Sequence, residues 1–221
     1  LRIDNFQTQE RLEPMSRFKI RKLMAIMKHI ADMPAGEIAL SNPILNRRLK
    51  KIQREEPHAI DTSIETIYLL RIIVSNVNAT MNYGMPVRGI IQLGQYLRSR
   101  GDKVDFVKLD GWLTALQLHG MAELQGNVLI SVFGFEQDEL PFVARTDQKA
   151  YRLTLRSVSD LAKDTAQEWH FRQNSAGFVQ NNNAVLRRNL SRSLRYMGYA
   201  PVETTSNFFH NFVRSLSEIE E

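Results

Sequence analysis

Two runs of basic residues are the side chains in this sequence best placed to do chemistry. In both runs, lysines and arginines recur at helical spacing, within residues 42–56 and within residues 183–199. The first basic run contains Arg47, Lys50, Lys51 and Arg54, and the second contains Arg187, Arg188, Arg192 and Arg195. Guanidinium groups bind phosphate and carboxylate oxygens in pairs, so these runs predict contacts with nucleic acid or an acidic partner. The alternative is that both runs are hydrated helix faces that keep the protein in solution.

Arg88 is a separate candidate for anion binding. It follows Tyr83-Gly84-Met85-Pro86, which predicts a break between two helices, and it therefore stands at a helix start. Backbone N–H groups at a helix N-terminus attract anions. We expect Arg88 either to bind an anionic group there or to pair with a carboxylate of the core.

The patterns of known catalytic and metal sites are absent from the sequence. It has no glycine-rich phosphate loop, no Gly-x-Ser-x-Gly elbow and no His-Glu-x-x-His. It has no cysteine, which excludes disulfides, thiolate metal sites and cysteine catalysis. The five histidines are scattered, without metal-ligand spacing: His29, His58, His119, His170 and His210. We therefore predict no metal and no cofactor.

One acidic cluster could in principle hold a hard cation. Glu136, Asp138 and Glu139 place three carboxylates within four residues. A calcium loop also needs spaced carbonyl ligands and a glycine, whereas Pro141 follows this cluster at once. A hydrated acidic turn, or a helix cap, is the interpretation that we adopt.

Helical periodicity dominates the segments that carry these residues. Apolar residues recur at three- and four-residue spacing between Pro14 and Met33, which predicts a helix with one apolar stripe. Asn42 and Pro43 are residue types preferred at an N-cap and at the first helical position. A second helix is therefore expected to begin there and to carry the first basic run on its outer face.

The segment from residue 62 onward predicts the central helix of the fold. Thr62 and Glu65 match a capping box, and apolar residues then occur on nearly every side of the helix. We expect burial of Ile67, Leu70, Ile73, Val74 and Val77, with Trp112 and Leu116 packed on the same core. Arg71 must then reach solvent or a carboxylate, for which Asp110 and Glu123 are the candidates.

The later helices show similar signals. Asp105 is expected to cap one helix, Gly120 to separate it from the next, and Gly134 to close that next helix. Between Asn183 and Tyr199, leucines share one face, Arg188, Arg192 and Arg195 lie nearly opposite them, and Arg187 stands to one side. This pattern predicts that the arginines of the second run point outward.

These patterns predict an all-α fold, an irregular bundle of about eight to ten helices around a buried central helix. We divide the chain into a basic helical N-terminal segment, residues 1–60, and a helical domain, residues 61–221. One continuous domain, residues 1–221, is the alternative. The net charge of +5 and the 43% hydrophobic content exclude wholesale disorder.

The sequence also bears on the location of the protein. Its longest apolar stretch, residues 64–77, contains Glu65 and Arg71 and is shorter than a membrane-spanning helix requires. Residues 1–10 lack the basic and apolar regions of a signal peptide. We expect a cytoplasmic protein without a membrane partner.

Three segments together point to a protein family. They are YGMPVRGIIQL at residues 83–93, FGFEQDELPF at residues 133–142, and YAPVE at residues 199–203, after the second basic run. In this order and spacing they resemble the C-terminal helical half of an uncharacterised bacterial nucleotidyltransferase-like family, over about residues 60–212. The resemblance places Arg88 in the glycine–arginine turn of that family, with Pro86 where a glycine is usual.

This sequence lacks the catalytic features of that family, and their absence limits what the resemblance implies. The family's α/β core carries a Gly-Ser turn and paired aspartates for metal-assisted nucleotidyl transfer, and this sequence has neither. The resemblance thus implies the helical part alone, or a member without catalytic carboxylates. We interpret the protein as a non-catalytic helical binding module whose partner is an anionic ligand, a nucleic acid or another protein.

Two alternatives to this interpretation stay open. The first is a nucleic-acid or acidic-partner binding protein that uses the basic helix faces. The second is a divergent nucleotidyltransferase whose carboxylates come from Asp102, Asp105 and Asp110.

Overall fold

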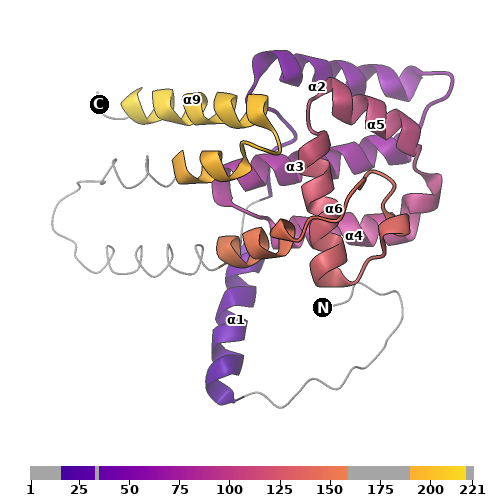
Figure 1. Ribbon diagram of the computed structural model, residues 1–221. Helices are drawn as coiled ribbons and strands as arrows, with labels where there is room; N and C mark the ends of the chain where they lie inside the picture. The colour runs from indigo at the N-terminus through magenta and orange to yellow at the C-terminus, as the bar shows by residue number, and fades with distance from the viewer. Residues whose placement is uncertain (1–15, 33–34, 159–189, 218–221) are drawn as a thin grey trace.

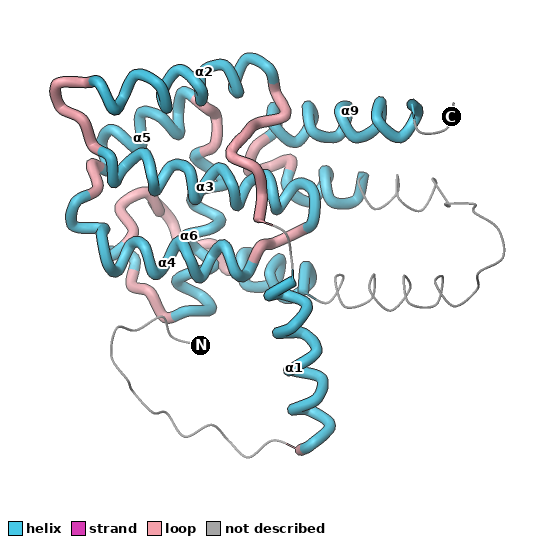
Figure 2. The backbone as a smooth tube through the Cα atoms, turned by 180° about the vertical axis from the view of Figure 1, so that it is seen from behind, coloured by secondary structure: helices cyan, strands magenta, loops and turns pink. Residues whose placement is uncertain are grey.

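The structure, a computed structural model, describes residues 16–32, 35–158 and 190–217, and all regular elements among them are helical (Figures 1 and 2). The labelled α-helices are α1 (Arg17–Asp32), α2 (Pro43–Glu55), α3 (Ile64–Tyr83), α4 (Val87–Arg100), α5 (Phe106–Ala115), α6 (His119–Phe133) and α9 (Pro201–Ser217). Residues 149–158 and 190–196 are helical as well. Short 3₁₀ turns occur at η1 (Glu56–His58), η2 (Gly101–Lys103) and η3 (Gln137–Glu139). The prediction of an all-α bundle is confirmed.

Helix α3 is the centre of the bundle, as its apolar pattern predicts. It packs against α4, α5 and α6, and Figure 1 shows it running through the middle of the molecule. Ile67 is 7% exposed, and Leu70, Ile73, Val74 and Val77 are fully buried. Leu116 is also buried, and the half-buried Trp112 packs on the same core.

The side chain of Arg71 points out of the core, although the residue lies within the buried helix α3. Its side chain is exposed, and its guanidinium lies 5.7 Å from the centre of the Tyr68 ring. The two carboxylates expected as its partners instead flank a histidine: Asp110 Oδ1 is 2.9 Å from His119 Nε2, and Glu123 Oε2 is 4.0 Å from His119 Nδ1.

Several helix ends follow the local sequence signals. Asn42 Oδ1 accepts hydrogen bonds from the backbone N–H groups of Ile44 and Leu45, at 3.0 and 3.1 Å. Asp105 Oδ1 accepts one from the Lys108 N–H at 2.9 Å. Gly134 ends α6 in the left-handed conformation, with φ of 70°. Each of these contacts spans only a few residues, so the sequence alone is sufficient to predict it.

Two predicted boundaries are wrong. The capping box at Thr62 and Glu65 does not form: α3 begins after Ser63, which makes no side-chain cap bond. The Ser63 N–H instead donates a hydrogen bond of 2.8 Å to Glu56 Oε1. Gly120 does not separate two helices, because α6 already begins at His119 and the break lies around Gln117, whose φ is 54°.

The helices of the periphery position the site described below. In Figure 1, α9, residues 190–196 and residues 149–158 lie one below the other along one side of the bundle. Helix α9 is tied to the start of α2, because the buried Glu203 carboxylate accepts hydrogen bonds from the N–H groups of Ser41 and Asn42. Among the described helices, none has the length and apolar character needed to cross a membrane.

Candidate anion-binding pocket

A pocket of about 570 Å³ lies between the helix of residues 149–158 and the turn that follows residues 190–196. In Figure 1 the helix of residues 149–158, drawn in orange, lies below the helix of residues 190–196, drawn in a darker yellow. The pocket is lined by Asp147, Lys149, Arg152, Leu153, Arg156, Arg195, Gly198 and Tyr199. Four of these eight residues are cationic and one is anionic, so the net charge of the lining is positive.

Three cations of the helix of residues 149–158 face the pocket because another face of this helix is buried against the bundle. Ala150, Thr154 and Ser157 share one face at helical spacing and are all buried. Ser157 Oγ also accepts a hydrogen bond of 2.8 Å from the Met85 N–H, which docks this helix against the turn between α3 and α4. The cations Lys149, Arg152 and Arg156 therefore fall on an adjacent face that stays open to the pocket.

The opposite wall is held by two close contacts. Tyr196 is fully buried and anchors residues 190–196 in the core. Gly120 of α6 packs directly on the backbone of Tyr199, and a Cβ at residue 120 would lie 2.6 Å from the Tyr199 carbonyl oxygen. These contacts place Arg195 and Tyr199 at the edge of the pocket.

Asp147, the carboxylate of the lining, is engaged in hydrogen bonds with its neighbours. Its Oδ2 accepts from the Tyr199 hydroxyl at 2.8 Å, and its Oδ1 accepts from the Lys149 N–H at 2.8 Å. Its own N–H donates to Asn127 Oδ1 of α6 at 2.6 Å. Asp147 thus joins the two walls of the pocket and is held in place from the core side.

The environment of Tyr199 keeps its hydroxyl protonated. Burial raises the pKa of Tyr199 well above its usual range, and the hydrogen bond to Asp147 raises it further. Burial also raises the pKa of Tyr196. Tyr199 therefore acts as a hydrogen-bond donor over the whole physiological pH range.

The charges in the pocket favour an anion over a cation. Lys149, Arg152, Arg156 and Arg195 face one carboxylate, and no carboxylate of the described residues forms an ion pair with Lys149, Arg152 or Arg156. Within the described part of the chain, no group of histidine and acidic residues is arranged to hold a metal ion. Phosphate and carboxylate groups are the ligands that such clustered guanidinium groups recognise.

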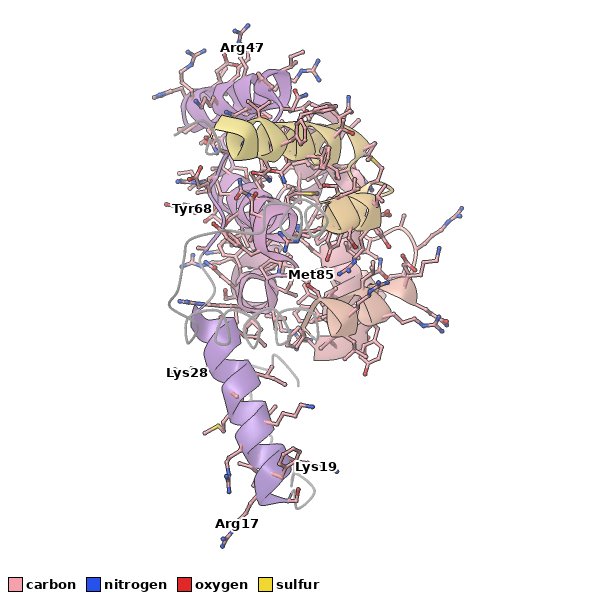
Figure 3. All side chains as sticks on the ribbon, turned by 90° about the vertical axis from the view of Figure 1, so that its left-hand side faces the viewer. Arg17, Lys19, Lys28, Arg47, Tyr68 and Met85 are labelled. Atoms are coloured by element: carbon pink, nitrogen blue, oxygen red, sulfur yellow. The ribbon has the colours of Figure 1, made fainter. Side chains whose placement is uncertain are left out.

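The first basic run lies at the other end of the molecule from α1 and outside this pocket. Arg47, Lys50, Lys51 and Arg54 are all exposed on α2, and Figure 3 shows Arg47 pointing away from the body. Lys51 and Arg54 approach Glu55, at 3.9 and 3.5 Å. We call these four residues the α2 basic face.

The second basic run does not join the α2 basic face. Arg187 and Arg188 lie outside the described residues. Arg195 lines the pocket. Arg192 turns inward and donates to the backbone carbonyl of Asn82, whereas Leu190 and Leu194 are exposed. The expectation that the arginines of this helix point outward is therefore wrong for Arg192.

Arg88 occupies the predicted position but not the pocket. It is exposed in the first turn of α4, at a helix start, as the sequence indicates. It is not among the residues that line the pocket.

Most of the carboxylates considered as catalytic or metal-binding groups have other partners. Asp105 caps α5, Asp110 faces His119, and Asp102 is exposed in η2. In the acidic cluster, Glu139 accepts hydrogen bonds from the Glu136 N–H at 2.8 Å and from Arg98 at 3.1 Å. The cluster is thus a capped turn joined to α4.

Sequence reasoning missed most of the pocket. Lys149, Arg152 and Arg156 have the same three- and four-residue spacing as the two basic runs, so their helical face was visible in the sequence. Asp147 and Tyr199 carry no comparable signal, because they are 52 residues apart and meet only in the folded chain.

Comparisons with known proteins leave the pocket as the main indication of function. No protein-family model matches the chain, and no curated protein or solved structure matches it at a significant level.

Proposed function

We propose that this protein is a non-catalytic binding module that holds a small polyanionic ligand, of the phosphate-bearing class, in the pocket between residues 147–156 and 195–199. The observation that carries the proposal is the clustering of Lys149, Arg152, Arg156 and Arg195 around a concave surface. The volume of about 570 Å³ is within the usual range for small-molecule sites.

The length of the cationic row indicates more than one anionic group on the ligand. Lys149 and Arg156 are seven residues apart on one helix, which corresponds to about 10 Å along the helix axis. A di- or triphosphate matches such a row along its length, because each of its phosphate groups can meet a different cation. The side chains of Leu153 and Tyr199 add apolar and hydrogen-bonding surface for the remainder of the ligand.

The chemistry of the lining supports binding rather than turnover. The pocket brings together four cationic side chains and the protonated hydroxyl of Tyr199. The carboxylate of Asp147 already accepts two hydrogen bonds. General acid–base catalysis works best with a group whose pKa is near the working pH. The raised pKa of Tyr199 moves that hydroxyl away from this range. The resemblance to a nucleotidyltransferase-like family, itself a prediction, makes nucleoside triphosphates reasonable test ligands.

Calorimetric titration tests the proposal. Pyrophosphate and ATP, each with and without Mg²⁺, are titrated into the wild type and into the variants Arg152→Ala and Arg156→Ala. Each variant should weaken binding by about 1.5–3 kcal/mol, because each removes a charge-assisted hydrogen-bond donor. Arg47→Ala on the α2 basic face removes the same charge elsewhere and should leave binding unchanged.

The outcome also separates a pocket ligand from nucleic acid. Absence of binding at millimolar pyrophosphate and ATP, or an equal loss in Arg47→Ala, would contradict the proposal. The alternative outcome is binding of duplex DNA whose logarithmic binding constant falls with the logarithm of the salt concentration, with a slope of about −0.9 per phosphate contact. If substitution of Arg47 and Lys50 abolished that binding, the α2 basic face would be a nucleic-acid site instead.

A further inference from the structure

Helix α1 stands apart from the bundle. Figures 1 and 3 show it projecting from the body, with Arg17 at its far end. Helix α1 contacts α4, and Figure 1 shows that the C-terminal end of α1 is the part next to the body. Every residue from 17 to 25 is exposed. A helix of this length without tertiary support is marginally stable in water, so a surface that covers α1 would stabilise it.

The exposed side of α1 carries a regular apolar stripe. Ile20, Leu23, Met24 and Met27 have the spacing of four anchors on one helix face, and all four are exposed, Met24 by 63%. This i, i+3, i+4, i+7 pattern is the one by which amphipathic helices bind in apolar grooves.

The charges of α1 are almost all of one sign. Arg17, Lys19, Arg21, Lys22 and Lys28 are exposed, and Asp32 at the last position is its one acidic residue. None of these five cations forms an ion pair with a carboxylate of the described residues. A surface that covers α1 must therefore supply acidic groups next to apolar ones. A second copy of α1 would bring like charges together, so self-association is disfavoured.

Phe18 distinguishes between a protein groove and a lipid surface. It is 77% exposed and lies nine residues from Met27, which is two and a half turns at about 3.6 residues per turn. Phe18 and Met27 therefore point in opposite directions. A bilayer surface takes up only one face of a helix and would leave Phe18 in water. A groove that encloses the helix can bury both.

We propose that α1 is a docking helix, taken up by a protein partner whose apolar groove is rimmed by acidic side chains and closes around both faces of the helix. The stripe formed by Ile20, Leu23, Met24 and Met27 supplies the principal anchors, Phe18 supplies an anchor on the opposite side, and the cations meet the rim. This partner surface is independent of the pocket ligand.

Calcium-loaded calmodulin serves as the probe, because its acidic, methionine-rich grooves accept many basic amphipathic helices. Binding of the full-length protein is measured by calorimetry with calcium and with a chelator in its place. We expect calcium-dependent binding that weakens by about tenfold or more in Leu23→Asp, Met27→Asp and Lys22→Glu, and severalfold in Phe18→Ala. Ile60→Asp and Arg47→Glu change an exposed apolar residue and an exposed cation outside α1, and should leave binding unaltered.

Three results would overturn the proposal. The first is no calcium-dependent binding of the probe at micromolar concentrations. The second is binding to phosphatidylserine vesicles that is insensitive to Phe18→Ala, in the absence of binding to calmodulin. The third is a dimer in sedimentation equilibrium that Met27→Asp dissociates. Because all substituted side chains are exposed, unchanged thermal unfolding of each variant confirms that the bundle is intact.

Discussion

Arg192 donates its guanidinium N–H to the backbone carbonyl of Asn82, one residue before the end of α3. The last carbonyls of a helix lack partners within the helix and carry the negative end of its dipole. A cation at this position satisfies such a carbonyl and joins the helix of residues 190–196 to the central helix. An arginine that the sequence suggests for ligand binding therefore holds two helices together.

Replacement of Arg192 should destabilise the fold. Arg192→Ala removes a charged donor from a partly buried carbonyl, which should lower the free energy of unfolding by about 1–3 kcal/mol. Urea denaturation measures this change. Arg47→Ala, an exposed arginine on α2, should change stability by no more than about 0.5 kcal/mol. Equal effects of the two substitutions would show that the contact of Arg192 with Asn82 contributes nothing to stability.

Ile73 tests the central place of α3. Its side chain is fully buried, so Ile73→Ala should lower the free energy of unfolding by about 2–5 kcal/mol through lost apolar contacts and the resulting cavity. Ile60→Ala removes the same atoms from a fully exposed side chain, and chemical denaturation should detect little change. A harmless Ile73→Ala would mean that α3 is not the core helix.

Gly120 and Gly111 should respond to alanine in opposite directions. A Cβ at residue 120 would meet the Tyr199 carbonyl at 2.6 Å, so Gly120→Ala must displace the pocket wall. We expect a less stable protein that also binds pyrophosphate more weakly. A Cβ at residue 111 in α5 meets nothing within 4 Å. Gly111→Ala should therefore stabilise the helix by about 0.5–1 kcal/mol. Thermal unfolding and calorimetry of both variants measure these effects, and a tolerated Gly120→Ala would contradict the tight contact.

The raised pKa of Tyr199 predicts a change of stability in alkaline solution. The folded state holds the tyrosine proton more tightly than the unfolded state, whose tyrosine pKa is about 10. The stabilisation from this difference is complete below about pH 10 and is lost as the pH rises toward the folded-state pKa. Urea denaturation of the wild type should thus show a steeper loss of stability above about pH 10 than that of Tyr199→Phe. Parallel pH profiles would argue against a shifted pKa.

Local interactions explain which parts of the fold could be predicted. The side chains of Asn42 and Asp105 cap helices through bonds to residues two or three positions away. Gly134 closes α6 because glycine accepts a left-handed conformation without steric cost. The apolar residues on all sides of α3 required its burial whatever the neighbouring helices were. These features depend on neighbours along the chain, or on composition alone.

Competition between distant partners explains why other expectations fail. Thr62 and Glu65 have the residue types of a capping box, but the helix begins one residue later, after Ser63. The Ser63 N–H is held by Glu56, whose carboxylate also binds Lys108 at 2.9 Å. At residues 190–196, amphipathic spacing alone cannot show which face turns inward. The carbonyl of Asn82 and the packing of Tyr196 decided that arrangement, and Leu190 and Leu194 were left at the surface.

The sequence by itself determined the all-helical class, the central helix and most helix ends, because these follow from the side-chain types within one or two helical turns. Only the tertiary structure decided which cations share a site. Arg195 meets Arg152 and Arg156 across a pocket, while Arg192, three residues before Arg195, faces the end of α3. Both outcomes depend on how segments far apart in the chain pack together, and helical periodicity carries no information about that packing.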